Sequence, residues 1–252
     1  MRSAYFSGTT PRILAHRGLA LQAPENTLLA FLGALALGLT HLETDVRASR
    51  DGVAVLAHDP ELSRLVGRPE RIDSLSFAQL SSIALGADQH VCSLAEALDA
   101  FPEARFNLDI KSSDAVQPTV DAIRVARATD RVLVTSFSES RRRATVDQLP
   151  GVATSASAVL VAVSYVLAWL RLARPLDLLL RNIDAVQIPE RYHGLDLMSP
   201  PVLSLLRRQH REVHVFTIND PAEMLRLWKS GVDGVVTDRA DLAKLAVANF
   251  TH

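Results

Sequence analysis

Short apolar runs alternate with longer segments of helical periodicity along the whole chain. Runs typical of strands occur at 12–16, 41–47, 53–58, 105–111, 132–137, 152–155, 185–188, 212–217 and 234–237. Helical patterns lie between most of them, at 26–37, 93–100, 115–128, 139–147, 159–172, 200–209, 221–229 and 241–247. Repeated strand–helix units indicate a parallel sheet with right-handed crossovers. About eight such units in 252 residues favour an α/β fold, a closed (β/α)8 barrel, over an open doubly wound sheet.

One segment departs from this repeat. The run at 53–58 and the stretch at 60–83 follow the second strand directly, and we expect them to form a small excursion from the barrel. No Pro-rich or Gly/Ser-rich linker divides the remaining units. Residues 1–252 are therefore predicted to form a single domain.

Charged residues occupy one face of two predicted strands. Because side chains alternate along a strand, Glu43 and Asp45 share one face of the second run. Asp109 and Lys111 share one face of the fourth run in the same way. The opposite, apolar faces must meet the helices, so the charged side chains point into the barrel.

These inward charges have two interpretations. Each strand could neutralise itself, with Asp109 next to Lys111 and Asp45 next to Arg47. A functional site is favoured, because buried charges are costly without a partner and the active sites of such barrels lie at the C-terminal strand ends.

The residue types on these faces suggest a metal and acid–base chemistry. Glu43, Asp45 and Asp109 form an oxygen-only ligand set, which suits Mg2+ or Ca2+ better than zinc. His16 and His58 stand at strand ends, where a pair of histidines can serve as acid and base. A single histidine at a strand end is more often structural. The two histidines therefore indicate a site only in combination with the three carboxylates.

Positive charge accompanies the acidic face. Arg17 and Lys111 are of the kind that holds a phosphate, the arginine through a bidentate fork and the lysine as a point charge. Four further histidines are interpreted as structural or exposed, because no acidic companion is evident: His90, His193, His210 and His214.

The composition argues against nucleic acid as a partner. The 27 basic and 28 acidic side chains give a net charge of −1, which leaves no basic stripe for nucleic acid. The N-terminus lacks the apolar core of a secretory signal, so a cytoplasmic location is expected. The single cysteine, Cys92, cannot form an internal disulfide and is expected to be a small buried side chain.

Several short motifs stand at characteristic spacings. They are His16-Arg17-Gly18, Pro24-Glu25-Asn26-Thr27, Glu43-x-Asp45, His58-Asp59 and Asp109-x-Lys111, followed by segments at 134–137, 215–219 and 231–238. In these motifs the chain resembles the glycerophosphodiester phosphodiesterases, from about residue 13 to residue 245.

The resemblance implies a TIM barrel that uses a divalent metal to hydrolyse glycerophosphodiesters to sn-glycerol 3-phosphate and an alcohol. It implies that Glu43, Asp45 and Asp109 hold the metal, with Glu25 or its neighbours supporting the site. It implies His16 and His58 as the acid–base pair and Arg17 and Lys111 as phosphate-binding residues. Phe216 and Asn219 are expected in the substrate pocket.

Two departures from the family pattern affect these expectations. Asp109 stands where the family motif has Glu, which shortens the third ligand by one methylene. Phe216 stands where the family often has Trp, which keeps an aromatic wall but loses the indole N–H donor.

Two alternatives remain open. The Asp-x-Lys form is similar to sphingomyelinase D-like and lysophospholipase D-like phosphodiesterases, which act on lipid headgroups at a membrane surface; the segments at 24–27 and 231–238 favour the glycerol-specific branch. The other alternative is a barrel that only binds phosphorylated ligands. The paired histidines argue against it, because binding alone needs no acid–base pair.

The helical pattern between Val159 and Leu172 is apolar on nearly all sides. It lies in an uncharged stretch, 151–170, which is long enough to raise the question of a membrane span. A span is excluded because motifs on both sides of the stretch must meet in one site. The segment at 175–182 could cover the helix. We otherwise expect its outer face to contact a second copy of the chain, as a homodimer, or a membrane surface, where Arg171 and Arg174 could face lipid phosphates.

Overall fold

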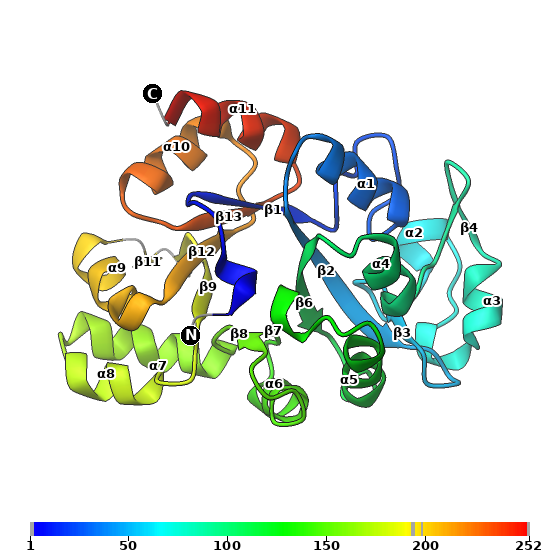
Figure 1. Ribbon diagram of the computed structural model, residues 1–252, viewed down its shortest axis with the longest axis horizontal. Helices are drawn as coiled ribbons and strands as arrows, with labels where there is room; N and C mark the ends of the chain where they lie inside the picture. The colour runs from blue at the N-terminus through cyan, green and yellow to red at the C-terminus, as the bar shows by residue number, and fades with distance from the viewer. Residues whose placement is uncertain (1–2, 193–194, 198, 251–252) are drawn as a thin grey trace.

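The structure is a computed structural model, which describes residues 3–192, 195–197 and 199–250. In this part of the chain, eight parallel strands curl into a nearly closed barrel surrounded by helices (Figure 1). The strands are β1 (Arg12–His16), β2 (His41–Ala48), β6 (Arg105–Ile110), β7 (Val132–Thr135), β8 (Ala153–Thr154), β9 (Ala185–Pro189), β12 (Glu212–Phe216) and β13 (Gly234–Thr237).

The strands follow the order β8-β7-β6-β2-β1-β13-β12-β9. A parallel bridge between Ser155 and Ala185 brings the two ends of this sheet together. The predicted (β/α)8 barrel is therefore confirmed.

Nine α-helices accompany the barrel strands among the described residues, and eight of them match predicted helices with small shifts at their ends. They are α1 (Leu28–Ala36), α4 (Leu94–Ala100), α5 (Val116–Val125), α6 (Glu139–Val146), α7 (Ala158–Trp169), α8 (Ala173–Leu179), α9 (Pro200–Leu206), α10 (Pro221–Lys229) and α11 (Ala240–Phe250). The unpredicted helix is α8. Its Pro175 stands in the first turn, where a missing N–H costs no helical hydrogen bond.

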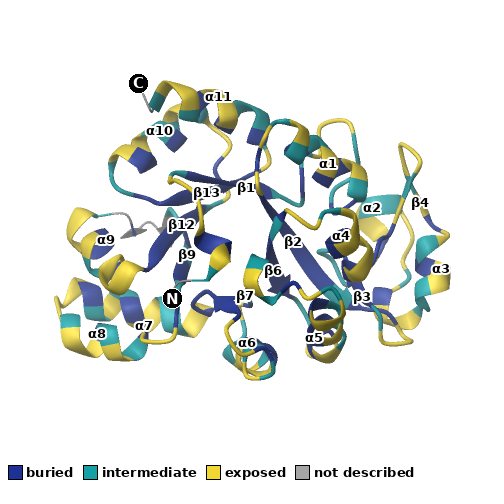
Figure 2. Cartoon of the chain, in the orientation of Figure 1, coloured by how far each residue is buried: buried dark blue, intermediate teal, exposed yellow. Residues whose placement is uncertain are grey.

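The alternation of apolar and polar residues sets the two layers of the barrel. Leu42 and Val46 of β2 and Phe106 of β6 are fully buried in the core between strands and helices. Phe106 meets the ring of Phe31 on α1 edge to face, with centroids 5.8 Å apart. Figure 2 shows buried residues gathered on the strands and the inward helix faces. The polar faces of β2 and β6 point into the barrel, as predicted.

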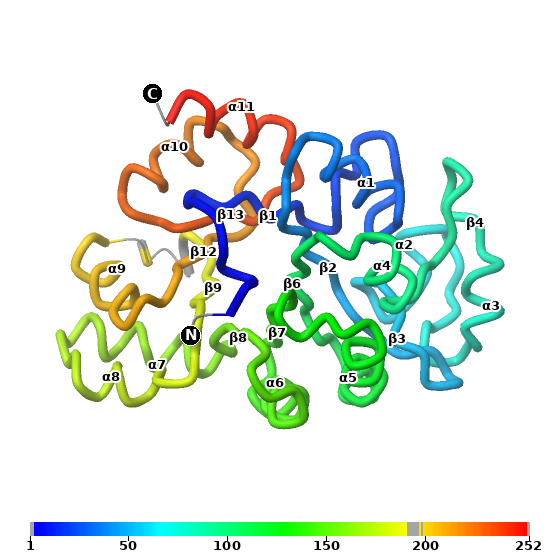
Figure 3. The backbone as a smooth tube through the Cα atoms, viewed as in Figure 1, coloured from blue at the N-terminus to red at the C-terminus, as the bar shows by residue number. Residues whose placement is uncertain are grey.

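The excursion after β2 is also present, and Figure 3 shows it on one side of the barrel, beyond β2. It consists of β3 (Ala54–Leu56), α2 (Ser63–Val66), η2 (Ile72–Ser74), α3 (Phe77–Ser81), β4 (Ala84–Gly86) and β5 (Gln89–His90). β3 pairs antiparallel with β2, and Val55, Leu62 and Leu80 belong to a small apolar cluster of the excursion itself. That the whole chain forms one domain stays a prediction.

The N-terminal end of the barrel is closed by the 3-10 helix η1 (Ala4–Phe6), seen in the centre of Figure 1. Tyr5 of η1 is fully buried and stacks edge to face on His41. Below it, Arg12 Nε lies 2.6 Å from Glu212 Oε2, and His214 Nε2 lies 3.0 Å from the same oxygen. The interpretation of His214 as a residue without an acidic companion is therefore wrong, because β12 places His214 and Glu212 on the same face. Its structural role is retained.

Cys92 has the buried position that the sequence predicted. Its Sγ donates a hydrogen bond to the carbonyl of Asn26, 3.3 Å away. Burial raises the pKa of its thiol, which fits an unreactive side chain. His90 and His210 are exposed, whereas His193 lies outside the described residues. Within the described part of the chain, we find no helix with both the length and the apolar character that a membrane span requires.

Acid should destabilise the protein through Glu212. Burial alone would raise the pKa of this carboxyl, but His214 and Arg12 lower it to about 2. Since this value lies below the pKa of about 4.3 in the unfolded chain, Glu212 stabilises the fold above pH 4.3, and this stability is lost as the pH falls toward 2. We expect a total loss of roughly 3 kcal/mol in the free energy of unfolding, most of it between pH 4.3 and pH 2.

Urea unfolding of Glu212→Gln tests this expectation. At pH 7 the variant should be about 3–5 kcal/mol less stable, because it leaves the Arg12 cation buried without its carboxylate. It should also lose less stability than the wild type between pH 4.3 and 2. The exposed Glu103→Gln is the control and should behave as wild type. Equal pH dependence of wild type and Glu212→Gln would contradict the role of Glu212.

Candidate active site

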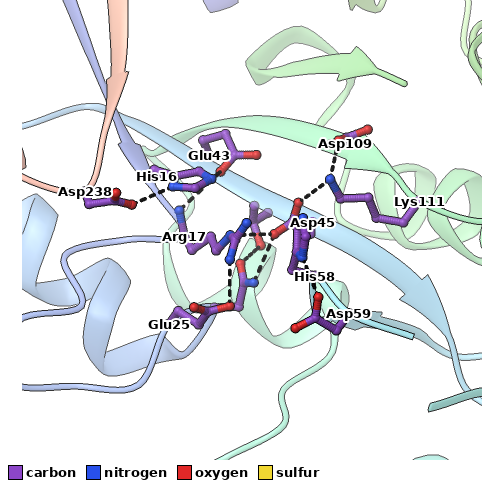
Figure 4. Close-up of polar contacts among 12 residues, drawn as sticks. His16, Arg17, Glu25, Glu43, Asp45, His58, Asp59, Asp109, Lys111 and Asp238 are labelled. Carbon is purple, nitrogen blue, oxygen red and sulfur yellow. Dashed lines mark hydrogen bonds and ion pairs between the residues drawn. The ribbon is translucent and has the colours of Figure 1, made fainter. Parts of the chain in front are cut away.

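A cavity of about 620 Å³ opens at the C-terminal ends of the barrel strands. The lining side chains come from strands and loops far apart in the sequence. Of the residues singled out from the sequence, it brings together His16, Arg17, Glu43, Asp45, His58, Asp109, Lys111 and Phe216. Figure 4 shows the polar contacts of all of these residues except Phe216.

His16 ends β1 and is held between two carboxylates. Its Nδ1 lies 2.6 Å from Asp238 Oδ1, and its Nε2 lies 3.8 Å from Glu43 Oε2. Burial alone would lower the pKa of His16, but the hydrogen bond to Asp238 and the charge of Glu43 raise it above its usual value. The carboxylate of Asp238 favours a proton on Nδ1, which leaves Nε2 as the nitrogen that faces Glu43.

Asn219 supports this arrangement from outside the cavity. Its Nδ2 donates to Asp238 Oδ2 at 2.8 Å, and its Oδ1 accepts from the Asp238 backbone N–H at 2.9 Å. Asn219 is exposed and is not among the described residues that line the cavity, so its expected contact with the substrate stays a prediction. It orients Asp238, which in turn orients His16.

His58 follows β3 and lines the same cavity as Asp45 (Figure 4). Its Nδ1 lies 2.8 Å from Asp59 Oδ1, and Asp59 accepts a hydrogen bond from Arg64 Nε. Each histidine of the pair therefore has a carboxylate at Nδ1. This arrangement fixes the orientation of both rings and gives both the same tautomer preference.

Arg17 directly follows His16 and pairs with two carboxylates. Its Nε lies 3.0 Å from Asp45 Oδ2, and its Nη1 lies 3.0 Å from Glu25 Oε1. The residue after it, Gly18, has a φ of +84°, and a Cβ there would lie 2.6 Å from the Ala30 carbonyl carbon. Glycine is required at this turn, which explains the third position of the His-Arg-Gly motif.

The segment after this turn braces β2. Asn26 donates from Nδ2 to Asp45 Oδ2 at 3.3 Å and accepts from Thr44 Oγ1 at 2.7 Å. Thr27 caps α1 by accepting from the Ala30 backbone N–H. Glu25 holds both Arg17 and Arg64. The Pro-Glu-Asn-Thr motif thus supports the site, as the resemblance implies.

Lys111 joins two of the three carboxylates. Its Nζ lies 2.8 Å from Asp45 Oδ1 and 2.6 Å from Asp109 Oδ2. The pair of Asp109 with Lys111, which the sequence left open as the less favoured alternative, is therefore present. The corresponding pair of Asp45 with Arg47 on β2 is absent. Asp45 pairs with Lys111 and Arg17 instead, and Arg47 Nε donates a hydrogen bond to the carbonyl of His58.

The three acidic side chains have different protonation tendencies. Burial and the neighbouring Asp45 raise the pKa of Glu43 to about 8. Burial also raises the pKa of Asp109, although Lys111 opposes this shift. Burial alone would raise the pKa of Asp45 too, but Lys111 and Arg17 lower it.

The described residues contain no group of three His, Cys, Asp or Glu side chains placed closely enough to hold a metal ion as they stand. The donor set nevertheless fits a hard divalent cation. All three carboxylates line the cavity, and Asp109 Oδ1 is buried without a hydrogen-bond partner among the described residues. The carboxylates of Glu43 and Asp109 crowd a buried space, and a cation would relieve their repulsion.

Some lining residues were missed from the sequence. Asn107 lies on the inward face of β6 with Asp109, so the period-two pattern already marked its position, but its amide was not considered. Val161, Ala162 and Tyr165 of α7 also line the cavity. No signal in the sequence distinguished this face of α7, because its other faces are apolar too.

The chain is similar in sequence to proteins of one known family. A family model described as "Glycerophosphoryl diester phosphodiesterase family" matches residues 16–242. A Mycobacterium tuberculosis relative, "Probable glycerophosphodiester phosphodiesterase 2", is 40% identical over 238 residues, covering 92% of this chain and 88% of the relative.

Solved structures are similar over nearly the whole chain. An Oleispira antarctica phosphodiesterase in complex with the product sn-glycerol-3-phosphate has a TM-score of 0.78 and 25% identity, over 98% of this chain and 100% of that one. A glycerophosphodiester phosphodiesterase from Agrobacterium tumefaciens has a TM-score of 0.76 and 22% identity, over 94% and 99%, and shows the fold alone. The resemblance inferred from the motifs is thus confirmed: the chain belongs to the glycerophosphoryl diester phosphodiesterase family and is a phosphoric diester hydrolase.

Proposed function

We propose that this chain hydrolyses glycerophosphodiesters to sn-glycerol 3-phosphate and an alcohol, with a divalent cation and a pair of acid–base histidines. One observation carries the proposal. The cavity at the barrel mouth combines three carboxylates with two histidines, His16 and His58, each held by its own carboxylate. A site that only binds a phosphorylated ligand needs no such pair.

In this proposal the chain's residues divide the work of a phosphoryl transfer. Arg17 and Lys111 bind the phosphoryl oxygens and orient the diester between His16 and His58. One histidine takes the proton of the attacking water, and the other gives a proton to the oxygen of the departing alcohol. The bond from phosphorus to the alcohol oxygen breaks as the bond to the water oxygen forms. Asp238 and Asp59 hold the two rings in the orientation that this exchange needs.

Glu43, Asp45 and Asp109 would hold the cation. When bound, it supplies positive charge against the negative charge that develops on the phosphoryl oxygens. Lys111 would then exchange part of its pairing with Asp45 and Asp109 for the phosphate. Oxygen ligands suit Mg2+ or Ca2+.

A second substrate class is favoured by one wall of the cavity. Phe137, Val161, Tyr165, Leu197 and Phe216 line it with apolar side chains. Such a wall suits a phosphodiester that carries an alkyl or acyl chain, as in a lysophospholipid. The alternative function is therefore a lysophospholipase D-like cleavage of lipid headgroups at the same polar site.

A product assay tests the proposal and separates the two classes. Glycerophosphocholine should yield sn-glycerol 3-phosphate and choline in the presence of Mg2+ or Ca2+. Lysophosphatidylcholine should yield choline without sn-glycerol 3-phosphate if the second class is used. Activity on the lysolipid alone would favour the alternative, and no product from either substrate with both metals supplied would contradict the proposal.

A further inference from the structure

Helix α7 presents apolar residues to three different surroundings. Val161, Ala162 and Tyr165 face the cavity, and Ala168 is buried in the core. A further row is exposed to solvent, with between 42% and 69% of each side chain accessible: Val159, Val163, Val166, Trp169 and Leu170. These positions recur every three or four residues, so they form one continuous stripe on the helix.

Two further leucines are exposed in the segment that follows α7. α8 packs against α7, and Figure 1 shows the two helices side by side at the edge of the barrel. Leu172 and Leu178 are exposed there. We call the surface formed by the stripe, Arg171, Leu172 and Arg174 the α7–α8 face. Exposed residues on both helices are visible in Figure 2.

The charge of this face is one-sided. Residues 158–182 contain three arginines and one acidic residue, Asp177. Asp177 is already bound by Arg208 and Arg211. Arg171 and Arg174 of this face are exposed and form no ion pair with another described residue. The face is therefore apolar with a local excess of positive charge, although the whole chain has a net charge of −1.

We propose that the α7–α8 face docks on the surface of an anionic phospholipid bilayer. Apolar side chains gain free energy on leaving water, and each arginine near an anionic surface contributes about 1 kcal/mol. An exposed tryptophan beside arginines is the combination found at membrane interfaces. A symmetric contact with a second copy fits less well, because it would bring the same arginines of both copies together.

This docking links the surface to the catalytic cavity. Because α7 forms both the docking stripe and one cavity wall, the bilayer surface would lie beside the cavity mouth. A phosphodiester that carries an apolar chain could then pass from the bilayer along α7 to the apolar wall. The docking itself does not depend on which phosphodiester is hydrolysed.

Co-sedimentation with vesicles tests the proposal. The probes are vesicles of phosphatidylcholine alone and of phosphatidylcholine with phosphatidylglycerol. Binding should occur with the anionic vesicles, be at least tenfold weaker with the neutral ones, and weaken as salt is added. The emission of Trp169 should shift to the blue, whereas the only other tryptophan, Trp228, is already buried.

Matched variants define the face. Val163→Glu and Val166→Glu should each reduce binding to anionic vesicles by about tenfold or more, without changing thermal stability, since both side chains are exposed. Leu245→Glu is the control, because Leu245 is 66% exposed on α11, outside the face. Arg174→Gln should reduce binding to anionic vesicles only.

Three outcomes would overturn the docking: no binding to anionic vesicles, an equal loss with Leu245→Glu, or a dimer in light scattering that Val166→Glu dissociates. Hydrolysis of glycerophosphocholine is measured in the same preparations without vesicles. Activity without vesicle binding would refute the docking while leaving the proposed function intact. Vesicle binding without activity would support the docking and contradict the proposed function.

Discussion

His16→Ala should lower kcat for glycerophosphocholine hydrolysis by a factor of about 10² to 10⁴. The ring loses the nitrogen that exchanges a proton with the substrate, while Glu43 and Asp238 remain in place. His58→Ala should have an effect of similar size, because the second proton transfer then lacks its partner. Steady-state kinetics on purified, metal-loaded variants measure both effects.

Two further variants show whether the loss of kcat is specific to the two catalytic histidines. Asp238→Asn removes the carboxylate at Nδ1 but keeps the volume, so it should lower kcat less than His16→Ala and leave KM nearly unchanged. His90→Ala replaces an exposed histidine of β5 and should retain the wild-type rate. A folded His16→Ala or His58→Ala variant with more than half of the wild-type rate would show that its assigned role is wrong.

Removal of divalent metal should abolish activity and lower the melting temperature. The three carboxylates repel one another when unneutralised, and a bound cation removes this repulsion. A cation at a hundredfold excess over its Kd stabilises the native state by about 2.7 kcal/mol. EDTA-treated protein should therefore melt at a higher temperature once Mg2+ or Ca2+ is restored, as differential scanning fluorimetry would show.

Asp109→Asn tests which residues bind this cation. The variant keeps the shape of the side chain but lacks the carboxylate charge, so it should show a smaller metal-dependent shift and a lower kcat. Asp73→Asn is the control, since Asp73 pairs with Arg71 at the exposed surface of the excursion. A wild-type melting temperature that is identical with and without both metals would argue against the site.

Much of the fold follows from local patterns. The alternation of residues in 41–47 and 105–111 predicted which side chains enter the barrel, because side-chain direction along a strand has a period of two whatever the strand contacts. Strand patterns depend only on neighbouring residues, so the ends of β1 and β13 were also predicted correctly. α8 was missed because Pro175 interrupts the local signal, although its place in the first turn is compatible with a helix.

The site was partly predictable for a related reason. The metal-ligand candidates and both histidines stand on or directly after strands, so their direction was set by the strands themselves. Their partners were not predictable. Asp238 meets His16 across 222 positions of sequence, and Lys111 meets Asp45 across neighbouring strands, contacts that depend on the order β6-β2-β1-β13.

The sequence by itself thus determined the barrel, its excursion and the set of polar side chains at its mouth, since strand and helix periodicities are properties of short segments. The tertiary structure decided which charges pair, as for Asp45 with Arg17 instead of Arg47. It also decided how the apolar sides of α7 divide among core, cavity and solvent. The charge pairs and the surroundings of α7 are set only when segments far apart in the chain pack together. The identity of an apolar residue does not show which neighbour will cover it.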